Sequence, residues 1–129
     1  MPIHIQDEPI IEKNWLQCPG CGDGALHHAG LVSYDRVEDA AETMVTELRP
    51  DGSLSRYPRA SQFTENPSSR RDGIAIRFWC EQCWCEQCSR MGRDPADLPD
   101  PPAAYELTIS QHKGGTYLCW REAVPFRGR

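Results

Sequence analysis

Six of the seven cysteines lie in C-x-x-C pairs, a spacing typical of metal-binding proteins. The pairs are Cys18/Cys21, Cys80/Cys83 and Cys85/Cys88. The last two arise because the sequence WCEQC occurs twice, without a spacer, over residues 79–88. Two C-x-x-C pairs supply the four thiolates of a tetrahedral zinc site. The chain is therefore predicted to bind one Zn²⁺, and it contains one cysteine pair more than that site needs.

The first pair fits a zinc knuckle, a tight turn from which both sulfurs point inward. Pro19 fixes the backbone φ angle there, and the glycines on either side of Cys21 permit left-handed backbone. The second knuckle is less certain. The pair Cys80/Cys83 directly follows a predicted strand, whereas use of the later pair would lengthen that strand and reverse the face that meets the first knuckle. We expect four ligands, with Cys85 and Cys88 as the alternative second pair: Cys18, Cys21, Cys80 and Cys83.

Four thiolates leave no open position for water on zinc, so the metal is expected to be structural and the chain is expected not to be an enzyme. A second zinc site would need further ligands such as His27, His28 or His112, and we do not expect one. Cys119 is interpreted as a small apolar side chain within a strand. No spacing supports a catalytic Cys/His pair between Cys119 and His112.

The composition indicates one small domain with a thin core. Val, Ile, Leu and Phe make up under a fifth of the 129 residues, while the chain contains 11 Pro and 10 Gly. A metal cross-link is a common remedy for so small a core. The odd number of cysteines argues against a closed disulfide framework. The first residues lack the features of a signal peptide and no apolar run could span a membrane, so a reducing cytoplasm is expected.

The periodicity predicts a mainly β protein with little helix. Alternating residues indicate strands within 25–35 and over 73–79, and a hairpin of 105–111 with 116–121. Polar loops are expected at 58–73 and 89–103, the second WCEQC copy is expected to form a spare knuckle in a loop, and the ends 1–8 and 122–129 are expected to be flexible.

The segment 35–48 has two interpretations. An apolar stripe with a helical period runs along it, and Asp35 with Glu38 resembles a helix capping box. The β-forming residues 43–48, followed by the turn sequence Pro-Asp-Gly-Ser and a short strand at 54–57, instead favour a hairpin. We favour a helical turn at 36–41 followed by that hairpin.

These elements resemble the zinc-ribbon family, in which a three-stranded β structure holds zinc between two knuckles. The resemblance covers the two C-x-x-C elements, the strand 73–79 and the hairpin 105–121. It implies a β-rich insertion between the knuckles, because 58 residues separate Cys21 from Cys80 where a compact site leaves about 15–20. The segments LQCPGCG, NPSSRRDG, IRFWCEQC and ISQHKGGTYLCW also resemble small uncharacterised zinc-ribbon proteins of actinobacteria and their phages, a likeness that implies no activity.

Charge and aromatic content suggest three functions. The net charge is −5, and residues 1–48 contain nine acidic but only two basic side chains, which disfavours non-specific nucleic-acid binding. The first hypothesis is therefore a protein-binding regulator that uses Trp84, the tryptophan we expect to be most exposed. The second is a nucleic-acid-binding zinc ribbon with a central arginine-rich face: Arg56, Arg59, Arg70, Arg71 and Arg77. The third is a thiol redox or metal-handling role for the cysteine run 80–88. No membrane partner is expected.

Overall fold

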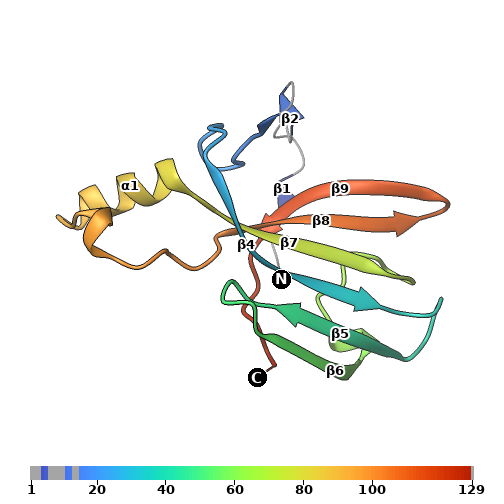
Figure 1. Ribbon diagram of the computed structural model, residues 1–129. Helices are drawn as coiled ribbons and strands as arrows, with labels where there is room; N and C mark the ends of the chain where they lie inside the picture. Colours follow the sequence, from blue (N-terminus) through green and yellow to red (C-terminus); the bar gives the residue numbers. More distant parts are fainter. Residues whose placement is uncertain (1–3, 6–10, 13–14, 129) are drawn as a thin grey trace.

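The computed structural model describes residues 4–5, 11–12 and 15–128, and it is mainly β as predicted (Figure 1). Within these residues there are nine strands, one α-helix and two short 3₁₀ helices. In chain order they are β1 (His4–Ile5), β2 (Ile11–Glu12), β3 (Trp15–Leu16), β4 (Leu26–Asp35), β5 (Glu42–Leu48), β6 (Leu54–Ala60), η1 (Ser61–Phe63), β7 (Gly73–Cys80), α1 (Glu81–Arg90), η2 (Pro95–Asp97), β8 (Tyr105–His112) and β9 (Gly115–Glu122).

The main sheet is antiparallel throughout, in the order β1-β9-β8-β7-β4-β5-β6, and β2 pairs separately with β3. The strand predicted at 73–79 and the hairpin predicted at 105–121 are confirmed as β7, β8 and β9. The segment 25–35 forms one long strand whose register shifts between His28 and Leu31. Gly30 lies at this irregularity with φ 92°, and a Cβ there would lie 2.3 Å from the carbonyl oxygen of Leu48. Only glycine fits that close backbone approach.

The segment 35–48 forms a hairpin arm, and the expected helical turn at 36–41 is wrong. Asp39 has a left-handed φ of 60°, and the amide of Ala40 bonds back to the carbonyl of Val37, which makes a turn between β4 and β5. Val37, a member of the proposed helical stripe, is exposed, whereas β5 buries every second side chain. The two-residue period of a strand therefore decides the structure here.

The second WCEQC copy forms a helix, which corrects the expected loop. Helix α1 starts directly after Cys80 and projects from one end of the sheet (Figure 1). Its sequence contains Glu and Gln, which favour helices, and no Gly or Pro. The spacing of three residues that makes a knuckle also fits one helical turn, so the cysteine pattern alone does not distinguish the two structures.

One face of the sheet carries a small core covered by the chain's own C-terminus. The apolar cluster there consists of Val32, Tyr34, Val45 and Ala75, with Tyr57 and Phe126 packed against it. The segment 123–128, expected to be flexible, crosses this face. The amides of Arg127 and Gly128 donate to the buried carboxylate of Glu47 on β5. Apart from His4–Ile5, the expected flexible arm at 1–8 lies outside the described residues.

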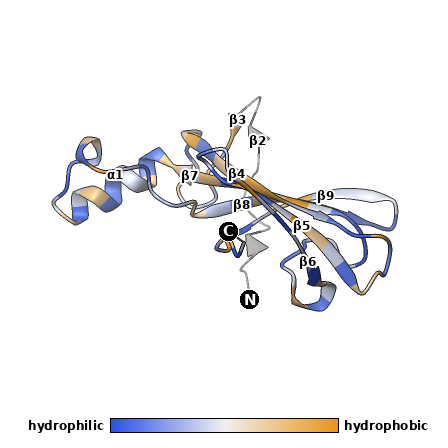
Figure 2. Ribbon diagram, turned by 60° about the horizontal axis from the view of Figure 1, so that its bottom comes forward, coloured by the Kyte–Doolittle hydropathy of each residue, from blue (hydrophilic) through white to orange (hydrophobic). Residues whose placement is uncertain are grey.

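The other face is covered at one end only. Figure 2 views the strands nearly edge-on, with the C-terminal segment on one side and β3 on the other. On this face the side chain of Trp120 is fully buried and contacts the rings of Phe78 and Tyr105. Farther along the same face, Ile74 and Leu118 are exposed. This open end is apolar, and it has no second layer among the described residues.

Candidate metal centre

The register of β4 and β7 brings the two cysteine pairs together. Cys80 ends β7 opposite Leu26 at the start of β4, and the next amide, that of Glu81, donates to the carbonyl of Ala25. The knuckle that precedes β4 is closed by two backbone bonds, from Cys18 to Asp23 and from Gly22 to Cys18. A ligand pair from a turn therefore meets a ligand pair from a strand–helix junction, although 58 residues separate them in sequence.

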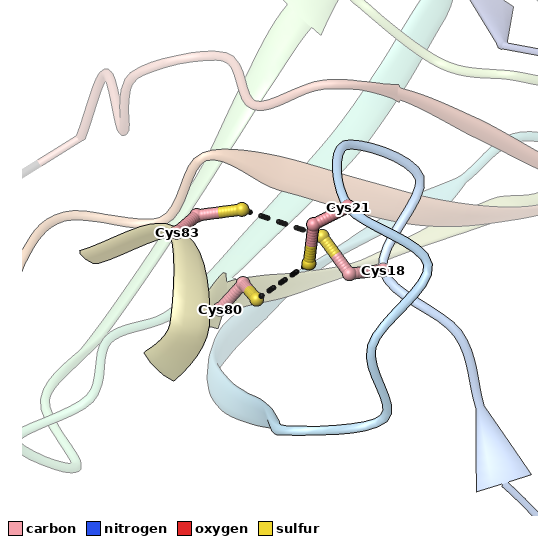
Figure 3. A group of neighbouring side chains, drawn as sticks. All are labelled: Cys18, Cys21, Cys80 and Cys83. Carbon is pink, nitrogen blue, oxygen red and sulfur yellow. Dashed lines mark hydrogen bonds between the residues drawn. The ribbon is translucent and has the colours of Figure 1, made fainter. Parts of the chain in front are cut away.

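The four sulfurs have the spacing of a tetrahedral thiolate site (Figure 3). All four ligand atoms lie within 4.8 Å of one another. The Sγ atoms of Cys18 and Cys83 are 3.8 Å apart, and those of Cys21 and Cys80 are 3.6 Å apart. A regular tetrahedron with metal–sulfur bonds of about 2.3 Å has edges of roughly 3.8 Å. The residues Cys18, Cys21, Cys80 and Cys83, selected from sequence, can therefore hold one metal ion.

The electrostatics of the cluster favour a bound cation. Burial raises the pKa of Cys18 to about 11. Burial and the neighbouring Cys80 thiol together raise the pKa of Cys83 well above its ordinary value. The pKa of Cys80 is lowered: burial opposes this, but the Cys83 amide and the neighbouring thiols that donate to its sulfur prevail. Neighbouring thiolates repel one another, so a divalent cation is needed for all four to ionise.

Backbone and aromatic groups surround the sulfurs. The amide of Gly20 donates to Sγ of Cys18 at 3.3 Å, as the knuckle geometry requires. A Cβ on Gly20 would lie 2.3 Å from the hydroxyl of Tyr105, so this glycine lets β8 approach the turn closely. Trp79, adjacent to Cys80, stacks on His27 with ring centroids 4.2 Å apart.

The expected exposure of the tryptophans needs a correction. Trp84 is half-buried on α1, whereas Trp15 before the first knuckle is 66% exposed. The ring of Trp15 lies over Gly24, where a Cβ would approach it to 2.5 Å. Trp15 therefore packs against the turn that contains the first cysteine pair, with most of its surface open to water.

The remaining cysteines and histidines lie outside this cluster. Among the described residues, the group of four cysteines is the one set whose ligand atoms converge. Cys85 is exposed and Cys88 is fully buried, both on α1 beyond the turn that holds Cys83. Cys119 is half-buried rather than buried. His112 pairs with Gly115, four residues from Cys119 along β9, so the two do not form a catalytic pair.

The five predicted arginines do not form one basic face. Arg77 is 5% exposed and bonds to Glu106 inside the core, so its assignment to a binding face is wrong. Arg70 pairs with Asp39 and Arg71 with Glu38, at the end of the sheet away from α1. Arg56 and Arg59 lie on the edge strand β6.

Comparisons with known proteins add no information about the site. Neither a family model, nor a curated protein, nor a solved structure matches this chain. Within the described part of the chain, no helix is long and apolar enough to cross a membrane.

Proposed function

We propose that the protein is a non-enzymatic, zinc-stabilised β module that binds another protein through the open apolar end of its sheet. Zinc is favoured by the donor set, because four thiolates at tetrahedral spacing suit Zn²⁺ and leave no position for a substrate. The ion would be structural. A reducing compartment such as the cytoplasm would keep these thiols available for metal.

The exposed apolar side chains on the open face of the sheet support the proposal of a protein partner. The register places apolar side chains in two rows across the strands. One row is Leu118–Ile109–Ile74 on β9, β8 and β7, and the other continues as Ile76–Leu31–Leu48–Leu54 to the edge strand. Leu54 is 64% exposed, and Leu118 and Ile74 are also exposed. A sheet normally buries its apolar face against a second layer.

The chemistry of this surface indicates which kind of protein segment would fit it. The centre of the patch carries no charge, and at its border Arg56 lies 3.7 Å from Asp35, so these two charges largely cancel. The surface therefore fits a protein segment with apolar side chains at its centre and polar groups around them. The nucleic-acid alternative has no comparable support, because the predicted arginines are separated, paired or buried.

The metal is tested by elemental analysis and native mass spectrometry. We expect one zinc per chain in the wild type and in the double variant Cys85→Ser/Cys88→Ser, but loss of zinc in Cys80→Ser/Cys83→Ser. Iron in place of zinc, or retention of metal by the Cys80→Ser/Cys83→Ser variant, would contradict the assignment.

The partner surface is tested with an Ile74→Asp/Leu118→Asp variant. Val37→Asp is the matched control, since Val37 is 80% exposed but lies in the turn between β4 and β5. We expect the wild type and the control to recover the same stoichiometric protein complex, and the sheet variant to lose it while it retains its zinc. Absence of such a complex, or a complex that the sheet variant also forms, would refute the proposal.

A further inference from the structure

Residues from three connecting segments line a cleft. These connections lie at the end of the sheet opposite α1 (Figure 1). They are the β4–β5 turn, the β6–β7 loop and the tight turn of the β8–β9 hairpin. The cleft has a volume of about 140 Å³. At about 30 Å³ for each water molecule, this space takes roughly five waters or one compact polyatomic ion. The metal centre lies at the other end of β7, so the two features are structurally separate.

The cleft is lined by more positive than negative groups. Arg70 and Arg71 come from the β6–β7 loop and Lys113 from the hairpin turn, against the single carboxylate of Glu38. His112 adds a ring that can donate a hydrogen bond. Among the ion pairs of the described residues, none includes Lys113. The lining therefore has an excess of cationic donors within a space the size of one small ion.

The two arginines are oriented by acidic partners yet keep donors for a ligand. Arg70 holds Asp39 through Nε and Nη2, at 2.7 and 2.5 Å. Arg71 holds Glu38 through Nε and Nη2, at 3.2 and 2.9 Å. Nη1 of each guanidinium takes no part in these pairs. Such side-on pairs fix the guanidinium planes before a ligand arrives.

The walls of the cleft are cross-linked to one another. Arg36 at the end of β4 binds two points of the β6–β7 loop, with its amide on Asp72 and its Nη1 on the carbonyl of Ser69. The amide of Asp39 donates to the carbonyl of Arg70. On the hairpin side, the amide of Gln111 donates to the hydroxyl of Ser68. These bonds join all three segments from which the cationic side chains extend.

The geometry points to this cleft as a binding site for a phosphate monoester group. A tetrahedral oxyanion with several acceptor oxygens matches converging guanidinium and ammonium donors. A long polyanion does not fit as well, since Glu38, Asp39 and Asp72 lie around the cleft and the chain has a net charge of −5. Glu38 would be an internal competitor that the phosphate displaces from Arg71. The site is independent of the proposed protein-binding face.

The first experiment titrates inorganic phosphate into the zinc-loaded protein at constant ionic strength and follows backbone amide shifts by NMR. We expect saturable shifts at residues 38–39, 69–71 and 112–114. Lys113→Asn and Arg71→Gln should each weaken binding about threefold to tenfold, the range for one charged contact. Asn is chosen because Lys113 has a left-handed φ of 48°, which Asn tolerates. Glu38→Gln should strengthen binding by a similar factor, since the competitor is removed.

Arg90→Gln, on the exposed surface of α1, is the matched control and should bind phosphate as the wild type does. Phosphoserine peptide and a nucleoside 5′-monophosphate then distinguish a phosphorylated protein from a free metabolite as the source of the group. Each is compared with its unphosphorylated form. The proposal is overturned if shifts do not saturate, if Lys113→Asn and Arg71→Gln bind like Arg90→Gln, or if Glu38→Gln weakens binding in a correctly folded protein. Folding of each variant is checked by its zinc content and its amide spectrum.

Discussion

A buried carboxylate between two arginines is the most sensitive point of the core, and the substitution Glu106→Gln tests it. Glu106 on β8 accepts from Nη1 of Arg77 on β7 and from Nε of Arg121 on β9, both at 2.8 Å. The amide of Val124 in the C-terminal segment also donates to it, at 3.1 Å. The three charged side chains are at most 7% exposed. Glutamine keeps the shape but removes the charge and places an amide donor among these donors.

The expected loss is large because two guanidinium groups would stay buried with no counter-ion. Removal of one partner from a buried ion pair costs about 3–5 kcal/mol. For a chain of this length, an unfolding entropy of about 2.1 cal/mol/K per residue converts 4 kcal/mol into a decrease in Tm of roughly 15 °C. The pKa of Arg77 is already lowered by burial, even though Glu106 opposes that effect. Glu106 therefore offsets part of the cost of burying the charged guanidinium of Arg77.

The assay is chemical and thermal unfolding of the zinc-loaded protein, followed by circular dichroism. Glu122→Gln is the matched control, because Glu122 lies on the neighbouring strand but is exposed. We expect that control to change the free energy of unfolding by less than about 0.5 kcal/mol. A Glu106→Gln variant within about 1 kcal/mol of the wild type would show that the triad is not the stabilising element described above.

Three further predictions test other parts of the structure. Burial raises the pKa of Tyr34 to about 12 from 10, so its stabilising contribution is complete below pH 10 and is lost as pH rises through 12. Between those pH values the free energy of unfolding should fall by about 2 kcal/mol more in the wild type than in Tyr34→Phe. Parallel plots of unfolding free energy against pH for the two proteins would contradict this. Phe126→Ala should destabilise the protein by about 2 kcal/mol, measured by urea unfolding, because its ring covers the core cluster and Arg77; no change would mean that the C-terminal segment contributes little. Removal of the metal by a chelator should increase hydrogen exchange at residues 18–25 and 80–83 more than in the β5–β6 hairpin, and uniform loss of protection would contradict that expectation.

The cysteine cluster could be predicted because each C-x-x-C pair is a local sequence signal. A C-x-x-C pair in a turn is typical of metal binding, and the strand that leads into Cys80 favours the pair that converges with Cys18 and Cys21 over Cys85/Cys88. The hairpin of β8 and β9 was equally predictable, since a Lys-Gly-Gly turn joins two alternating segments. In both cases the signal for each half lies within a few residues of the structure that it forms.

The features that sequence did not reveal depend on distant partners. Arg77 alternates with apolar residues and resembles a solvent-facing side chain, yet its Nη1 donates to Glu106 and to the carbonyl of Val124 inside the core. The C-terminal segment has no periodicity of its own, and it is ordered by hydrogen bonds to Glu47, 80 residues earlier in the chain. Helix α1 was concealed because the C-x-x-C spacing also fits a helical turn.

The two ends of β7 divide the molecule into separable sites. At one end, Cys80 and the nearby Cys83 on α1 supply two of the four proposed metal ligands. At the other end, Gly73 adjoins the β6–β7 loop that lines the cleft. Eight strand residues place these ends roughly 24 Å apart. Substitutions farther apart than about 10 Å, with no shared partner, usually act additively. Substitution of a cysteine ligand and substitution of Arg71 should therefore change the free energy of unfolding additively. Additivity would show that the cysteine cluster and the cleft are energetically independent.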